Sequence, residues 1–188
     1  MTATMTQGAL ANQSGRHHEQ SIRALLRAKG YTPVKARSLG ELRGQRKGLY
    51  TEAGCFAEQC EVPLIAPYHQ GRDRRVTVDF AVWTPGEQAV LLSVKSQESA
   101  GSADEKLEYE VSKLIATELP AALFVHGDGF RQAVLEEVWE RGRHHGNSRV
   151  LLFRTYPKLL HWIEDGMPVA GRGTTNSEIF MRYADLAP

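Results

Sequence analysis

Residues 76–97 read VTVDFAVWTPGEQAVLLSVKSQ, which is two apolar runs joined by a short polar turn. Alternation in the first run places its valine and phenylalanine side chains on one face and Asp79 on the other. By the same period of two, one face of the second run carries three polar side chains: Ser93, Lys95 and Gln97. The pattern therefore predicts a β-hairpin with charged side chains in the middle of apolar strands.

The turn fixes how the two strands face each other. If it is centred on Gly86, the numbers of opposed residues sum to 172, and Asp79 lies directly across from Ser93. Lys95 then lies two positions further along the same face. A carboxylate, a hydroxyl and an ammonium group are thus expected to meet on one patch of the sheet.

Length and composition favour one α/β domain. The chain has 188 residues and a net charge of +1, which neither requires nor excludes a nucleic-acid partner. We expect a flexible leader at 1–16, an α/β domain at 17–166 and a C-terminal arm at 167–188. No apolar run is long enough to span a membrane and no signal peptide is recognisable, so a cytoplasmic protein with no membrane association is expected. The two cysteines are expected to be reduced, with no role in a disulfide or a metal site.

The remaining pattern alternates between helices and strands. Helical spacing or capping predicts helices at 15–30, 102–115, 130–142 and 156–164. Apolar runs predict strands near 61–65 and at 121–126 and 149–153. This order predicts an α/β fold with a mixed central β-sheet flanked by helices.

A helix with a glutamate, a strand with Asp79, a strand ending in Ser93-Val94-Lys95 and a further helix together resemble the PD-(D/E)XK nuclease superfamily. The resemblance covers roughly residues 15–153 and implies a restriction-endonuclease-like fold. In that family the strand aspartate and an acid two residues before the lysine hold Mg²⁺, and the lysine activates water. Ser93 stands at the position of the second acid. One group of restriction enzymes shares Ser-x-Lys and takes the missing carboxylate from the next helix.

The resemblance implies Asp79, the Val94 carbonyl and one helix glutamate as Mg²⁺ ligands, with Lys95 polarising the water. Glu105 in the first helical turn is the first candidate for the relocated acid, and Glu108 one turn along is the second. Glu110 is the third glutamate that this helix offers for the missing acid, and a solvated residue or an outer-shell partner is its other reading.

Three further residues are candidates with ordinary alternatives. Ser93 supports the site or only fills space, and Gln97 supports it or only ends the strand. Glu19 is a first-helix acid near the metal, or a helix N-terminal charge favoured by the helix dipole.

A polar, basic segment precedes the Asp79 strand. Its side chains are placed to contact DNA phosphates or base edges, and a solvated turn explains them nearly as well. These residues are His69, Gln70, Arg72, Arg74 and Arg75.

The sequence thus predicts a Mg²⁺-dependent endonuclease of the type II restriction kind, acting on double-stranded DNA as a homodimer within a restriction-modification setting. A DNA repair or junction-resolving nuclease is the alternative within the same class. Because Ser93 stands where the second acid is expected, an inactive DNA-binding module of the same fold is a further alternative. An α/β interaction protein with no nucleic-acid role is the third.

Overall fold

The computed structural model describes residues 7–48, 54–65, 74–98, 103–144 and 150–168. Its centre is a six-stranded sheet in the order β1-β2-β3-β4-β5-β6. The strands are β1 (Thr32–Pro33), β2 (Cys55–Pro63), β3 (Arg75–Trp83), β4 (Ala89–Ser96), β5 (Ala121–His126) and β6 (Val150–Phe153). The helices are α1 (Gln7–Ala28), α2 (Leu39–Gly48), α3 (Ala103–Ile115), α4 (Gln132–His144) and α5 (Tyr156–Glu164). The predicted mixed sheet flanked by helices is confirmed.

Strand directions divide the sheet into two parts. β2, β3 and β4 are antiparallel neighbours, whereas β4, β5 and β6 run parallel. The β3–β4 ladder pairs Trp83 with Ala89 and Phe80 with Leu92, so opposed residue numbers sum to 172 as the turn predicted. The predicted hairpin register is confirmed, and it fixes which side chains share a face.

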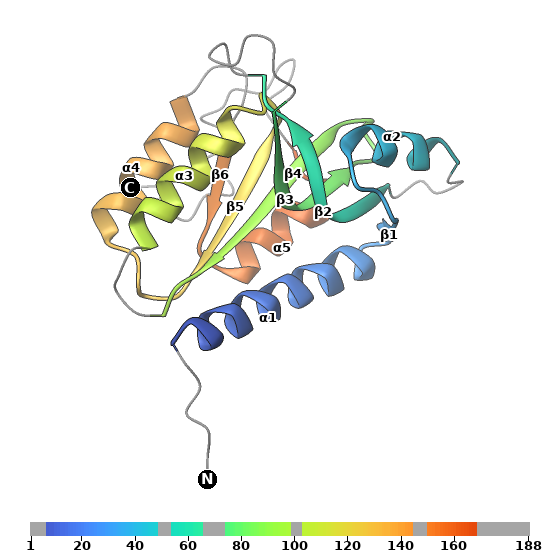
Figure 1. Ribbon diagram of the computed structural model, residues 1–188. Coiled ribbons are helices and arrows are strands. Elements are labelled where there is room, and N and C mark those ends of the chain that lie inside the picture. Colours follow the sequence, from blue (N-terminus) through green and yellow to red (C-terminus); the bar gives the residue numbers. More distant parts are fainter. Residues whose placement is uncertain (1–6, 49–53, 66–73, 99–102, 145–149, 169–188) are drawn as a thin grey trace.

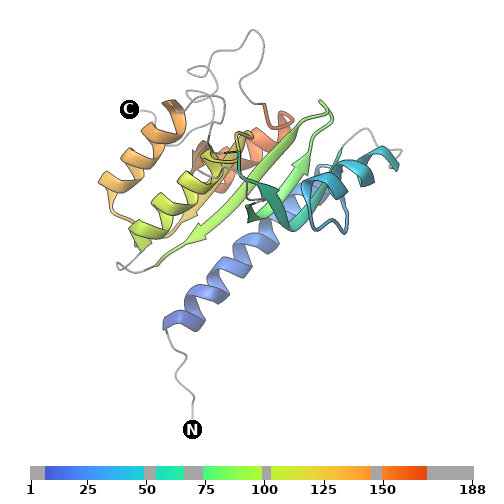
Figure 2. The ribbon, with the colours of Figure 1, turned by 45° about the horizontal axis from the view of Figure 1, so that its top comes forward.

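Helices cover both faces of the sheet (Figure 1). Lys95 on β4 contacts Glu110 of α3, and α4 packs beside α3 on that face. Phe124 on β5 points to the opposite face, where its ring meets His18 of α1 and Tyr156 of α5. A second view shows the same order of layers, with α3 and α4 together on one side of the strands (Figure 2). The Asp79 face is therefore the face that carries α3.

The first helix ends where the sequence predicts but begins earlier. Gly30 adopts φ of 84°, and the backbone N–H of Tyr31 donates to the carbonyl of Leu26 at 3.1 Å, as in a helix end closed by glycine. At the other end α1 begins at Gln7, so residues 7–16 of the expected leader are helical. Alanine, leucine and glutamine in this segment have high helix propensity, which favours the extension.

The second strand also begins earlier than expected, at Cys55 rather than near Glu61. Cys55, Phe56 and Ala57 are all buried, so their successive apolar side chains conceal the period of two on which the prediction relied. Both cysteines are free and buried, and burial raises the pKa of the Cys60 thiol to about 11. They are inert thiols within the core.

No helix in the described part of the chain combines the length and apolar composition needed to cross a bilayer.

Candidate active site

Asp79 lies where β3 and β4 part. Their ladder runs as far as Phe80 and Leu92, and beyond it the backbone N–H of Val94 donates to Asp79 Oδ2 at 2.7 Å. The Gln59 amide donates to the other oxygen, Oδ1, at 3.3 Å. The side chain remains 19% exposed. The carboxylate is thus held by its neighbours while one edge still reaches solvent.

Three oxygen atoms converge on the ammonium group of Lys95. Its Nζ lies 3.1 Å from the Val94 carbonyl oxygen, 3.2 Å from Glu110 Oε2 and 3.8 Å from Asp79 Oδ2. Two of these oxygens come from carboxylates on different elements, β3 and α3. The three oxygens therefore create a negative electrostatic environment that favours a cation at this position.

Glu110 is the most enclosed acid of this group, with a side chain only 5% exposed. Its Oε1 lies 2.6 Å from Lys113 Nζ, one turn along α3. Burial favours the neutral acid, but the charges of Lys95 and Lys113 outweigh it, and the pKa of Glu110 is lowered from its usual value. The fully buried Ser93 hydroxyl contributes in the same direction. Glu110 is therefore an ionised carboxylate held inside the fold.

Lys113→Met is expected to cost about 3 kcal/mol of folding stability at neutral pH, because a buried carboxylate loses one of its two cations. Glu110 has a lowered pKa in the folded protein, so its ionic contribution is present above its ordinary value of 4.5 and is lost as the pH falls through the folded pKa. The difference between the variant and the parent should shrink in acid. Urea unfolding at neutral pH and below about pH 4 measures both values.

The exposed Lys106 on the same helix supplies the control: Lys106→Met should change stability by less than about 0.5 kcal/mol. An equal loss from Lys113→Met at both pH values would show that the Glu110 charge is not the cause. In that case the 2.9 Å hydrogen bond from Lys113 Nζ to the Thr77 carbonyl would account for the effect.

Glu19 on α1 is half-buried and lies within electrostatic reach of the same group. Burial raises its pKa, and the charges of Asp79 and Glu58 raise it further, while Lys95 and Arg23 oppose the shift. A first-helix acid therefore acts on the Asp79 and Lys95 charges although α1 packs on the other face of the sheet.

The two glutamates ranked first from the sequence lie elsewhere on α3. Glu105 is exposed and Glu108 is half-buried. Among the described residues, the acids that pair with Lys95 are Asp79 and Glu110. The acid that reaches the site is thus one that the sequence analysis treated as solvated or outer.

The other predicted residues fall into two groups. Gln97 follows β4 directly, and its backbone N–H donates to the His126 carbonyl at 3.0 Å. Arg74 and Arg75 are exposed at the start of β3, where Arg75 lies 3.7 Å from Glu61. The other predicted DNA-contacting residues lie outside the described residues: His69, Gln70 and Arg72.

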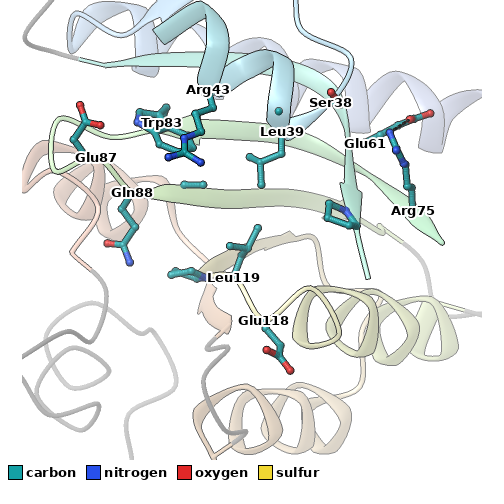
Figure 3. A pocket seen from close by; sticks show the side chains of 14 residues that line it. Ser38, Leu39, Arg43, Glu61, Arg75, Trp83, Glu87, Gln88, Glu118 and Leu119 are labelled. Carbon is teal, nitrogen blue, oxygen red and sulfur yellow. Dashed lines mark ion pairs between the residues drawn. The ribbon is translucent and has the colours of Figure 1, made fainter. Parts of the chain in front are cut away.

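A groove of about 730 Å³ lies between α2 and the loop that follows α3 (Figure 3). Arg43 of α2 stands 6.0 Å from the centre of the Trp83 ring at one part of it, and Arg75 lines another part beside Glu61. The groove is separate from Lys95 and its three oxygens. Those oxygens lie at the point where β3 and β4 part rather than in this groove.

Sequence reasoning placed Glu110 behind Glu105 and Glu108 and missed Gln59, although a signal for Glu110 was present. Glu110 is three residues after Leu107 and four before Leu114, so it falls within the buried stripe of α3. A charged residue inside an apolar stripe needs a partner, which Lys113 provides. Gln59 on β2 gave no comparable signal, because its contact with Asp79 depends on the β2–β3 register.

The donor set fits a hard divalent cation. Carboxylate and carbonyl oxygens are the ligands that Mg²⁺ prefers, and it commonly takes only one or two carboxylates from the protein. Asp79, Glu110 and the Val94 carbonyl provide such a set around the position of one cationic group. These residues suit Mg²⁺ better than a soft metal.

Comparison with known proteins identifies a family but no individual relative. The chain gives no match to a curated protein or to a solved structure. A family model described as a PD-(D/E)XK nuclease superfamily domain matches residues 10–155, which include most of α1, the β3–β4 hairpin, α3 and β5. On this match over most of its length, the chain belongs to the PD-(D/E)XK nuclease superfamily.

Proposed function

We propose that this protein is a cytoplasmic, Mg²⁺-dependent endonuclease of the type II restriction kind that hydrolyses phosphodiester bonds in double-stranded DNA. The observation that carries the proposal is the convergence of three oxygens on Lys95 Nζ, at 3.1 to 3.8 Å. A site that holds an ammonium group among carboxylate and carbonyl oxygens can hold a metal ion and a lysine side by side once the lysine turns toward water.

Each residue has a chemical role in this proposal. Asp79 and Glu110 provide negative oxygens for Mg²⁺, and the Val94 carbonyl provides a neutral one. The ion, when bound, neutralises charge that develops on the phosphate during attack. Lys95 is then released to hold and polarise the attacking water, because its positive charge favours the hydroxide form.

Glu110 replaces the acid that Ser93 lacks. Ser93 is fully buried beneath it, so a carboxylate at position 93 would compete with Glu110 for the same space and the same cations. Moving the acid to α3 keeps two carboxylates around Lys95 while leaving a small hydroxyl in the sheet. The sequence ranks Glu110 behind Glu105 and Glu108 for this role, and here it takes their place.

The exposed Arg74 and Arg75 are proposed to contact the DNA backbone. Arg75 lies four residues before Asp79 on the same strand, about 13 Å away at the usual rise of a β-strand. Phosphate contacts at that distance position a duplex without reading its sequence. We further propose a homodimer, since two copies allow each to cut one strand.

Incubation of the protein with plasmid and phage DNA in Mg²⁺, followed by mapping of the cut ends, tests the proposal. Discrete fragments with uniform ends are expected, and light scattering should give the mass of two chains. Preference for branched over linear duplex would instead indicate a repair or junction-resolving nuclease. Absence of cutting with Mg²⁺, Mn²⁺ and other divalent ions, together with salt-dependent DNA binding, would favour the inactive DNA-binding module.

A further inference from the structure

A second cluster of metal-ligating side chains lies beyond the Lys95 group. It joins three elements: His18 comes from α1, His126 is the last residue of β5, and Glu98 follows the end of β4. One ligand atom from each residue lies within 4.8 Å of those of the other two. Residues distant in sequence are thus brought within the reach of one ion.

The backbone fixes two of the three residues. β4 and β5 pair up to Ser96 and His126, and beyond them the Gln97 N–H donates to the His126 carbonyl at 3.0 Å. Gly127 follows with φ of 92°, where a Cβ would lie 2.2 Å from the Gln97 carbonyl oxygen. Only glycine permits this close approach, which brings the segment carrying Glu98 beside His126. The carboxylate Oε1 of Glu98 lies 3.5 Å from His126 Nδ1.

The third residue is buried and oriented. His18 is 6% exposed, its ring centre is 4.1 Å from that of His126, and its Nδ1 lies 2.5 Å from the Tyr156 hydroxyl. That contact leaves Nε2 available as a ligand. Metal-binding histidines commonly use their second ring nitrogen in this way, which sets the tautomer and the ring orientation.

Burial also favours the metal-binding form of His18. Burial, followed by the neighbouring His126, lowers the pKa of His18 and so favours the neutral imidazole. His126 Nδ1 is shielded from solvent and makes no hydrogen bond to the described residues. His126 Nδ1, which lies near the Glu98 carboxylate and the His18 ring, is therefore a candidate metal ligand.

From these contacts we propose that His18, Glu98 and His126 bind a first-row transition-metal ion, with Zn²⁺ as the best match. Two imidazole nitrogens and one carboxylate oxygen form a three-ligand zinc set that leaves a fourth position for water. The all-oxygen group around Lys95 suits Mg²⁺ instead, so ligand chemistry separates the two sites. The ion would tie α1 to the ends of β4 and β5, and this inference does not depend on the nuclease proposal.

The test uses the full-length protein, freed of metal by a chelator and then titrated with Zn²⁺ against a chromophoric competitor. One equivalent is expected to bind and to raise the unfolding temperature, because the ion binds the folded chain. Co²⁺ in place of Zn²⁺ should give the visible absorption of a low-coordinate nitrogen and oxygen site. None of these measurements involves DNA, so failure here is distinct from failure of DNA cleavage.

Variants locate the ion. Glu98→Gln and His126→Ala remove a ligand and should weaken Zn²⁺ binding by more than the roughly 10-fold loss expected from Tyr156→Phe, which removes only an orienting contact. Glu98 is exposed, so its replacement should leave folding intact. His161→Ala is the matched control, since it removes an exposed histidine from α5 and should leave binding unchanged.

Two results would overturn the proposal. One is a parent protein that binds no stoichiometric Zn²⁺. The other is binding that survives Glu98→Gln and His126→Ala but is lost in Asp79→Asn, which would place the ion beside Lys95.

Discussion

Glu110→Gln is expected to lower the rate of Mg²⁺-dependent DNA cleavage by about 1,000-fold. The amide keeps the size of the side chain but removes one of the two negative charges beside Lys95. A catalytic metal stabilises the transition state by several kcal/mol, and each 1.4 kcal/mol corresponds to about tenfold in rate. Cleavage rates at saturating DNA and a range of Mg²⁺ concentrations measure the effect, and the variant should also require more Mg²⁺.

Glu105→Gln and Glu108→Gln are the matched controls, because they make the same chemical change on the same helix. Glu105 is exposed and should tolerate it fully, and Glu108 should retain most of its activity. Loss of cleavage in Glu105→Gln or Glu108→Gln, with Glu110→Gln still active, would return the relocated acid to the residues first expected. Urea unfolding of Glu110→Gln separates lost chemistry from lost folding, since Lys113 loses its ionic partner in that variant.

Asp79→Asn should lower the rate of Mg²⁺-dependent cleavage by a similar factor, about 1,000-fold, while preserving the fold. Asparagine offers a carbonyl oxygen that can still accept the hydrogen bond from the Val94 N–H, now made to Asp79 Oδ2 at 2.7 Å. What it loses is the charge that attracts a metal ion. This variant therefore separates the structural role of the side chain from its chemical role more cleanly than alanine would.

The measurement is cleavage by Asp79→Asn in Mg²⁺ beside DNA binding with Ca²⁺ in place of Mg²⁺. Binding at the parent level with no cleavage is the expected pair of results. Retained cleavage would mean that the metal is held without Asp79, and the proposed ligand set would then be wrong. Circular dichroism of the variant should match that of the parent.

Much of the fold was predictable because it depends on local pattern. The turn at Gly86 and the period of two in 76–97 determined the hairpin register, and the approach of Lys95 to Asp79 follows from it. The strand at Ala121–His126 and the helix at Tyr156–Glu164 have the predicted bounds. The predicted bounds were wrong at the ends of elements where apolar residues do not recur at a regular spacing, as at the start of α1.

The remainder of the site depends on packing between distant elements. Glu110 reaches Lys95 only because α3 lies across the sheet at a particular rotation, which the spacing of its apolar residues indicates but does not fix. Glu19 on α1, in the other helix layer, is within electrostatic reach of Asp79 and Lys95. The proposed metal-binding residues His18 and His126 come from α1 and β5, two elements about one hundred positions apart. No sequence motif indicates that they meet.

The parting of β3 and β4 has a mechanical consequence. Asp79 stands on the antiparallel arm, which continues with β2, and Lys95 stands on the parallel arm, which continues with β5. The gap between the backbones of the two residues therefore depends on the twist between two halves of the sheet. Substitutions in the core beneath either arm can thus widen or narrow the gap without touching a charged residue, and the geometry of the cluster is a property of the whole sheet.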